Sequence, residues 1–251
     1  MAMTETPARP DAQRGLEANG KTTAASQVYR RLRADILQGA LEPSSKLRID
    51  FLCARYRAGG SPVREALNRL SSEGFVDRED QRGFFVAPVS LKGLRELVKT
   101  RRWLEARALQ EAIANRSNAW EEAIVLALHR LTRTVRFVDP ETGEAPEAGR
   151  PAGTLAQNPA WESHHHAFHH ALIASCGSSI LLRYCEELRD RSDRYRLIAA
   201  ASVYPRRNDR DEHRAIAEAA LEGRSDEAVA LLMAHYERTL GIIEGHFSAG
   251  G

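Results

Sequence analysis

Residues 61–76 read SPVREALNRLSSEGFV and indicate the fold of the N-terminal part of the chain. Ser61 is a residue type that caps helices, and Pro62 would then take the first helical position, where a proline loses no hydrogen bond. Gly74 is the residue type that most often ends a helix in a left-handed conformation. The stretch therefore predicts a short helix that starts after Ser61 and stops at Gly74.

The sequence on either side of this helix predicts two more helices and a β-hairpin. Apolar residues recur at three- and four-residue steps from Val28 until Gly39, which indicates a helix. A second short helix is expected over residues 47–56. Residues 75–90, FVDREDQRGFFVAPVS, hold two apolar runs around a charged turn, the pattern of a hairpin. Three helices followed by a hairpin are the layout of a winged helix-turn-helix domain, expected over residues 25–90.

The composition is that of a folded globular protein, with 251 residues, 43% hydrophobic residues and a formal net charge of +2. No apolar run reaches the roughly 20 residues that span a bilayer, and residues 1–24 lack the apolar stretch of a signal peptide. We therefore expect a cytoplasmic protein with no membrane partner and with a disordered tail over residues 1–24. The three cysteines stand singly, so neither a disulfide framework nor a cysteine zinc site is expected. Residues 21–90 carry twelve Lys and Arg against eight Asp and Glu, which favours an anionic partner for this part.

The rest of the chain, residues 91–248, predicts an all-helical domain of about six helices. The expected breaks between helices lie near Ser117, at residues 139–159, at Gly177, around Pro205 and at Gly223. The stretch 139–159 contains several prolines and glycines and is expected to be a surface loop. The fold class is therefore mainly α, with a winged helix-turn-helix domain followed by a helical bundle.

Residues 161–170 read WESHHHAFHH and hold five histidines on one predicted helix. At about 100° per residue, His165 lies at the centre of an apolar face, and His169 lies on the same face one turn later. The other three histidines, His164, His166 and His170, point away from that face. A single histidine on an apolar face is usually a hydrogen-bonded core residue, but two that are stacked one turn apart can reach the same cation.

Two further histidines, His213 and His235, lie on either side of the predicted turn at Gly223. In an antiparallel pair of helices they would stand at the same height, and each has apolar neighbours on its own helix. Buried imidazoles without partners are costly, and a shared metal ion would satisfy all four together. The spacing leaves two interpretations open: a metal site formed by His165, His169, His213 and His235, or a polar network in the core.

A second group of polar residues falls on predicted apolar helix faces. Arg101 shares a face with leucines, and Glu105 follows one turn later. A buried arginine needs an anion, which would be either Glu105 or the carboxylate of a ligand held by the guanidinium fork. Arg189 and Arg196 share a face with Cys185 and are candidates for further anion contacts, although long arginines also extend to the surface. The predicted effector-binding residues are therefore Arg101, Glu105, Arg189 and Arg196.

The N-terminal segments VYRRLRADILQGALEPSSKL, SPVREALNRLSSEGFV and QRGFFVAPVS together resemble the GntR family of bacterial transcription factors. The resemblance implies that Arg64, early in the recognition helix, contacts DNA, and that Arg69, Arg57 and Arg82 lie near phosphates. The full set of expected DNA-binding residues is Arg64, Ser61, Arg57, Arg69, Arg82 and Gly83. Residues 59–61 read GGS where the family commonly has a polar residue, an arginine and a threonine. Some contacts made there in relatives are therefore missing or are made by neighbours such as Arg57.

The C-terminal segments WESHHHAFHHALIASCGSSILLRYCEEL and RDEHRAIAEAALEGRSDEAVALLMAHYERT resemble the all-helical FCD effector-binding domain of the FadR-type branch of that family. The resemblance implies a divalent metal held by an acidic residue and three histidines, and the three histidines fall on His169, His213 and His235. The acidic position is His165 here, and a neutral imidazole favours Zn(II), with Ni(II) as the other candidate. The RYR motif at residues 194–196 and the two cysteines near it further resemble the branch that contains the glutarate-sensing carbon-starvation regulator.

Two functions are compatible with these residues. The first is a ligand-responsive DNA-binding repressor, a homodimer on a pseudo-palindromic double-stranded operator, controlled by a small carboxylate effector at the metal site. The second is a metal-dependent enzyme with a four-histidine site. Such an enzyme needs a general base beside the metal, but the H-E-x-x-H motif of zinc hydrolases does not occur. The sequence therefore favours the regulator over the enzyme.

Replacement of Arg64 by alanine should weaken operator binding by about 1–3 kcal/mol if its guanidinium reads a base edge. Fluorescence anisotropy with a labelled operator duplex at fixed salt measures this change. The alternative for Arg64, as for the other arginines, is a solvated surface charge. Unchanged operator affinity of the Arg64→Ala variant would support that alternative.

Overall fold

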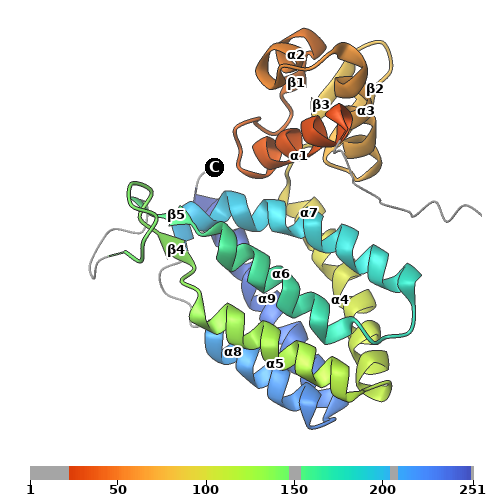
Figure 1. Cartoon of the computed structure of the whole chain (residues 1–251), viewed down its shortest axis with the longest axis vertical. Coiled ribbons are helices and arrows are strands. Elements are labelled where there is room, and N and C mark those ends of the chain that lie inside the picture. The colour runs from red at the N-terminus through yellow and green to blue at the C-terminus, as the bar shows by residue number, and fades with distance from the viewer. Residues whose placement is uncertain (1–22, 147–153, 204–208, 250–251) are drawn as a thin grey trace, which may run out of the picture.

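The computed structural model describes residues 23–146, 154–203 and 209–249. It contains a small N-terminal domain stacked on a larger helical domain (Figure 1). Residues 1–22 of the predicted tail and the predicted break at Pro205 lie outside the described residues.

The N-terminal domain contains three helices and a small antiparallel sheet. Its elements are α1 (Ala24–Leu37), β1 (Lys46–Leu47), α2 (Ile49–Tyr56), α3 (Gly60–Ser72), β2 (Val76–Glu79) and β3 (Gly83–Val86). Strands β2 and β3 form the predicted hairpin, with Val76 opposite Val86, and β1 pairs with the other edge of β3. This is the predicted winged helix-turn-helix domain with one additional strand. The sequence did not reveal β1 because a two-residue strand carries no alternating pattern.

Helix α3 begins two residues earlier than expected. Its N-cap is Gly59, which makes no side-chain capping hydrogen bond, and Ser61 lies exposed in the first turn. The prediction that Ser61 caps this helix is therefore wrong. Pro62 still costs no hydrogen bond, because the first N–H groups of a helix have no partner within it. The helix ends as predicted before Gly74, whose φ of 76° is the left-handed conformation that favours glycine.

An apolar core holds the N-terminal domain together. Val28, Leu32 and Ile36 of α1 pack with Leu67 and Leu70 of α3, and all five are at most 3% exposed. The three- and four-residue spacing in α1 places its apolar side chains on one side of the helix. This core is separate from the core of the helical domain.

The second domain contains six helices within the described residues, as predicted. They are α4 (Leu91–Ala114), α5 (Asn118–Arg133), α6 (Pro159–Ile173), α7 (Ser179–Val203), α8 (Asp209–Leu221) and α9 (Ser225–Ala249). A two-stranded antiparallel sheet joins the ends of the predicted surface loop 139–159 and consists of β4 (Phe137–Val138) and β5 (Ala156–Gln157). The sequence did not reveal this sheet because its strands, like β1, have only two residues each and carry no alternating pattern.

Polar side chains start several of these helices. Ser90, Ser117 and Asn158 each accept a hydrogen bond from a backbone N–H in the first turn of α4, α5 and α6. Pro159 takes the first position of α6, where it needs no hydrogen-bond partner. No helix in the described part of the chain is long and apolar enough to cross a membrane.

Helix α7 lies along the side of the helical domain that faces α1 (Figure 1). Asp190 of α7 forms an ion pair with Arg33 of α1 at 2.7 Å. Arg194 donates from Nη2 to the carbonyl oxygen of Ala87, directly after the wing, at 2.6 Å. Helix α7 therefore connects the helical domain both to α1 and to the end of the wing.

Replacement of Leu67 by alanine should destabilise the N-terminal domain by about 2–5 kcal/mol, because its fully buried side chain would leave a cavity. The matched substitution Asn68→Ala, at the exposed neighbour, should change stability by no more than about 0.5 kcal/mol. Urea unfolding followed by circular dichroism measures both effects. Similar losses in the two variants would contradict the assignment of Leu67 to this core.

Candidate metal and effector site

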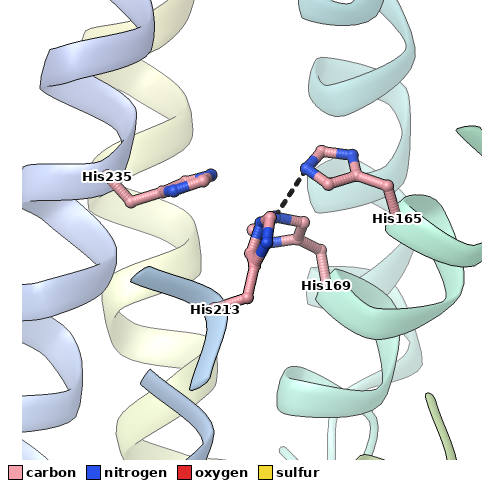
Figure 2. Close-up of side chains that lie close together, drawn as sticks. All are labelled: His165, His169, His213 and His235. Carbon is pink, nitrogen blue, oxygen red and sulfur yellow. Dashed lines mark hydrogen bonds between the residues drawn. The ribbon is translucent and has the colours of Figure 1, made fainter. Parts of the chain in front are cut away.

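Four buried histidines from three helices point toward one another in the helical domain (Figure 2). Two come from α6, one from α8 and one from α9: His165, His169, His213 and His235. Their ligand atoms all lie within 4.8 Å of one another, and none of the four residues is more than 9% exposed. The structure therefore brings together the four histidines that were singled out from helical phase and from the turn at Gly223. We refer to them below as the histidine cluster.

The other three histidines of α6 lie outside the histidine cluster. Nδ1 of His164 lies 2.9 Å from the hydroxyl oxygen of Thr134. Nε2 of His166 accepts a hydrogen bond from Arg189 at 2.8 Å. His170 is exposed. Two of the five histidines in this segment thus enter the cluster and three do not.

Neighbouring side chains fix the orientation of the imidazole rings. Nδ1 of His235 lies 2.8 Å from a carboxylate oxygen of Glu212, so this nitrogen donates and Nε2 is left for the cluster. Nδ1 of His169 lies 3.4 Å from the hydroxyl of Tyr236. Nε2 of His169 lies 3.1 Å from Nε2 of His165, the contact drawn in Figure 2. The Nε2 atoms of His165 and His169 therefore face each other inside the cluster.

The imidazoles of His165 and His169 are held in their neutral form. Burial lowers the pKa of His165 well below its ordinary value, and the neighbouring His169 lowers it further. Burial likewise lowers the pKa of His169, with further contributions from His235 and His213. Neutral imidazole is the form that binds a metal ion.

The donor atoms of the cluster fit a divalent transition-metal ion. Imidazole nitrogen suits Zn(II), Ni(II) and Cu(II), whereas Mg(II) and Ca(II) prefer oxygen ligands. Zn–N bonds of about 2.0–2.1 Å let two ligands of one ion lie up to about 4.2 Å apart. The 3.1 Å between the Nε2 atoms of His165 and His169 falls within that limit, and the full spread of 4.8 Å requires only a small contraction.

A cavity opens beside the histidine cluster, and His165 and His235 form part of its wall. Three arginines line it, namely Arg101, Arg136 and Arg196. Four aliphatic side chains also line it, namely Leu94, Val98, Leu240 and Ile243. Of the predicted effector-binding residues, Arg101 and Arg196 lie in the wall, whereas Glu105 and Arg189 do not.

Arg101 is 8% exposed and forms an ion pair with Glu105 at 2.5 Å, the alternative that needs no ligand. It also donates to the hydroxyl of Tyr236 at 3.2 Å, and that hydroxyl donates to Glu105. Burial alone would lower the pKa of Arg101, but Glu105 and Tyr236 raise it above its ordinary value. The guanidinium is therefore charged, and it is held by a closed set of hydrogen bonds beside the histidine cluster.

The other two arginines of the cavity also have carboxylate partners. Arg136 forms an ion pair with Asp209 at the start of α8. Arg196 contacts Glu162 of α6 through two hydrogen bonds, one of them 2.8 Å long, and Asp193 at 3.2 Å. All three cavity arginines are thus neutralised by carboxylates of the chain itself.

Trp161 links these arginines to the histidine cluster. Its ring stacks on His165, with centroids 4.7 Å apart and planes 14° from parallel. The guanidinium carbon of Arg136 lies 4.4 Å from the centroid of the Trp161 ring, and that of Arg196 lies 5.9 Å from it. The indole therefore orients His165 and separates it from the two cations.

Arg189 is 4% exposed but does not line the cavity. It donates to Nε2 of His166 at 2.8 Å and to Glu186 at 3.5 Å. This position gives no support to its predicted role as an anion contact of the cavity.

The predicted DNA-binding residues occupy more than one surface of the N-terminal domain. Exposed members of the set are Arg57, Ser61, Arg64 and the wing residue Arg82, which is followed by the half-buried Gly83. Arg69 is exposed as well, but its guanidinium carbon lies 3.7 Å from the ring centroid of Tyr29, and it pairs with Glu73 at 3.1 Å. Arg69, Tyr29 and Glu73 line one pocket together with Asp190 of α7. Arg69 therefore faces the helical domain.

Residues 235–237 read HYE, the H-x-E spacing found in some zinc enzymes. The side chain of Glu237 is 58% exposed and forms an ion pair with Arg102 at 2.5 Å. This carboxylate therefore supplies no general base to the histidine cluster.

Sequence reasoning missed several neighbours of the site. Arg136 and Asp209 are 73 positions apart and meet only through tertiary packing. Glu162 and Arg196 are 34 positions apart on two different helices. Tyr236 follows His235 in the sequence, but adjacent residues of a helix point about 100° apart. Its position next to His235 therefore did not predict that Tyr236 also lies at the site.

The winged helix-turn-helix domain and the helical domain with its internal cavity define a class of proteins, DNA-binding transcriptional regulators with a separate effector domain. The family described as "Bacterial regulatory proteins, gntR family" matches residues 24–86, and the FCD domain matches residues 96–238. The chain belongs to the GntR family and carries an FCD domain.

Similar proteins agree with this assignment. The HTH-type transcriptional regulator BphR of Paraburkholderia xenovorans is 35% identical over 216 residues, which cover 86% of this chain and 83% of the relative. The HTH-type transcriptional repressor GlaR of Escherichia coli is 32% identical over 227 residues, which cover 89% and 97%. The solved structure of E. coli McbR/YncC has the same fold, with a TM-score of 0.69 at 20% identity over 90% of this chain and 99% of that one. These relatives are regulators, and the chain is a transcriptional regulator rather than an enzyme.

The metal-free protein should lose stability as the pH falls below about 6.5, the ordinary pKa of histidine. In the unfolded chain His165 and His169 take up protons near that pH, whereas burial keeps them neutral in the folded state. The unfolded state then binds more protons, so the free energy of unfolding decreases by up to about 1.4 kcal/mol per pH unit for each histidine. Urea unfolding of chelator-treated protein between about pH 7.5 and pH 5.5 measures the slope.

Replacement of the exposed His170 by glutamine is the matched control and should leave this slope unchanged. Replacement of both His165 and His169 by glutamine should reduce it. A flat profile for the unaltered chain would contradict the neutral state of the two buried rings.

Proposed function

We propose that the protein is a metal-containing repressor whose binding to DNA responds to a small carboxylate. The observation that carries this proposal is the convergence of four buried imidazoles, two of which lie in the wall of a cavity that three arginines also line. A cation at the cluster would offer an anion a second attraction beside the guanidinium groups. A carboxylate matches both, because it binds metal ions and is attracted by the positive charge of guanidinium groups.

The proposed metal is Zn(II), with Ni(II) as the second candidate, because the donor set contains only imidazole nitrogen. The proposed ligands are His165, His169, His213 and His235. When bound, the cation supplies a Lewis-acidic position for an anionic oxygen of the effector. Glu212 and the hydroxyl of Tyr236 hold the rings of His235 and His169, and such outer contacts strengthen metal binding.

The proposed effector-binding residues are Arg101 and Arg196, to which the position of Arg136 in the wall adds a third. Each is already paired with a carboxylate of the chain, so they would act on the bound anion through their charge. Glu105 would act by holding Arg101 in place rather than by touching the ligand. Arg189 is left out of the set because it pairs with His166 and Glu186 outside the cavity.

Helix α7 is the proposed route from the effector to the DNA-binding domain. Asp193 and Arg196 of α7 line the cavity. On the same helix, Asp190 pairs with α1 and Arg194 binds the backbone after the wing. A ligand that shifts α7 would therefore change the position of the winged domain, and DNA would in turn change the affinity for the ligand by the same factor.

The proposed partner is a double-stranded, pseudo-palindromic operator that is bound by a homodimer in the cytoplasm. One winged domain offers too few contacts for specific binding, and two related by a two-fold axis read two half-sites. The similarity to GlaR, which is a transcriptional repressor, supports repression as the direction of control.

Single replacement of His169, His213 or His235 by alanine should remove the bound metal and lower the melting temperature, because a bound ion stabilises the folded state by mass action. Inductively coupled plasma mass spectrometry of protein loaded with zinc and then dialysed measures the metal content. His165→Ala should weaken metal binding only in part, because His165 replaces the acidic residue of the family pattern.

The alanine variants of His164, His166 and His170 are matched controls on the same helix and should keep the metal. The cluster variants should also lose the response of operator binding to carboxylates while they still bind operator, because the winged domain has a core of its own. Equal metal loss in the controls, or full metal content without His213 or His235, would exclude the site as proposed.

A further inference from the structure

We infer that the effector is a small monocarboxylate with a hydrocarbon portion rather than a dicarboxylate. This inference rests on the proposed function, because it takes the histidine cluster as a cation site and the cavity as the effector site. It follows from the pairing of the cavity arginines, the balance of charges around the cavity and the aliphatic part of its wall.

Arg196 shows most clearly that the arginines are already engaged. Its Nη1 donates to one carboxylate oxygen of Glu162 at 2.8 Å, and its Nη2 donates to the other. Asp193 accepts from Nε at 3.3 Å and from Nη2 at 3.2 Å. The side chain of Arg196 is 7% exposed. A ligand carboxylate at this arginine would have to displace Glu162 or Asp193, which would leave a partly buried carboxylate without its cation.

Arg136 and Arg101 are engaged in the same way. Arg136 and its partner Asp209 have side chains that are only 14% and 12% exposed, and Arg136 also lies over the ring of Trp161. Arg101 and Glu105 are still less accessible, at 10% and 2%. Arginines in such pairs can orient an anion through their charge. They do not require one, because carboxylates of the chain already neutralise them.

The charges around the cavity leave room for one anion. Within the described part of the chain, the three arginines of the wall face four carboxylates, those of Glu105, Glu162, Asp193 and Asp209. Imidazoles that bind a metal ion are neutral, so this group of arginines and carboxylates carries one net negative charge, and a divalent cation at the cluster would give it one net positive charge. The carboxylate of Glu212 beside His235 is left out of this balance because it is paired with Arg238 at 3.2 Å. A single carboxylate would neutralise the site, whereas a dicarboxylate would bring an excess negative charge into a cavity whose arginines are already paired.

The aliphatic part of the wall supplies the second element of recognition. Leu94 and Val98 come from α4 and Leu240 and Ile243 from α9, two helices that pack together. A hydrocarbon portion of the ligand would cover these side chains and displace water from them. A second carboxylate in this position would instead lose its hydration without gaining a cation.

Isothermal titration calorimetry of the full, zinc-loaded chain tests the inference with two ligand series. One series consists of the straight-chain monocarboxylates from propionate to hexanoate, and the other of the α,ω-dicarboxylates of the same chain lengths, from malonate to adipate. The tightest monocarboxylate should bind about tenfold or more tightly than the dicarboxylate of equal length. Chelator-treated protein should bind neither with comparable affinity.

The variant Glu162→Gln tests the role of the internal pairs. It keeps the size of the side chain but removes a negative charge opposite Arg196, so that a second ligand carboxylate gains a partner. The ratio of monocarboxylate to dicarboxylate affinity should then fall by about tenfold. The matched control Glu186→Gln removes the carboxylate opposite Arg189, a buried arginine of α7 that does not line the cavity, and should leave the ratio unchanged.

Tighter binding of a dicarboxylate by the unaltered chain would overturn the inference and leave carboxylate sensing intact. Binding of neither series by protein of verified zinc content would overturn the proposed effector class as well. An unchanged ratio in a folded, zinc-containing Glu162→Gln variant would show that the internal pairs do not select the ligand. Because the comparison of the two series uses the unaltered chain, it decides the matter even if that variant fails to fold.

Discussion

The burial of four imidazole rings inside the FCD domain is the constraint on which the rest of the site depends. A buried histidine destabilises a fold when it must carry a charge or leave a nitrogen without a partner. Glu212 and Tyr236 meet this demand from the outer side of His235 and His169. On the inner side, Nε2 of His169 lies 3.1 Å from Nε2 of His165, and only one of these two atoms can carry a proton. The inner nitrogens converge, so a single cation would satisfy them together.

The position of α7 gives this cluster a physical connection to the winged helix-turn-helix domain. One face of the helix contributes Asp193 and Arg196 to the cavity, and the adjoining face contributes Asp190 and Arg194 to the contacts with the N-terminal domain. Both sets lie within seven consecutive residues, 190–196. A helix moves as a unit over such a distance, so any displacement at the cavity reaches the domain contacts directly. The separate core of the winged domain lets that domain move without being unfolded.

Much of this arrangement could be predicted from the sequence because it follows from helical periodicity. The phase of α6 separated His165 and His169 from the three outer histidines, and the turn at Gly223 placed His213 and His235 at equal height. The phase also placed Arg101 beside Glu105, and their ion pair confirms that alternative. Periodicity says nothing about which separate helices meet. The pairs of Arg136 with Asp209 and of Arg196 with Glu162 depend on tertiary packing over 73 and 34 positions and could not be read from the chain.

The ion pairs of the cavity arginines explain why a neutral histidine suits position 165. An acidic residue there, as in the family pattern, would add a fifth carboxylate to the four that already surround the three cavity arginines. A divalent cation would then only neutralise the site, and an anionic effector would gain no net attraction from it. The neutral ring of His165, which Trp161 holds by stacking, keeps one positive charge at the proposed metal-loaded site. A neutral imidazole at position 165 and the internal pairing of the arginines thus act together. Both determine the net charge that the proposed metal-loaded site presents to an anionic effector.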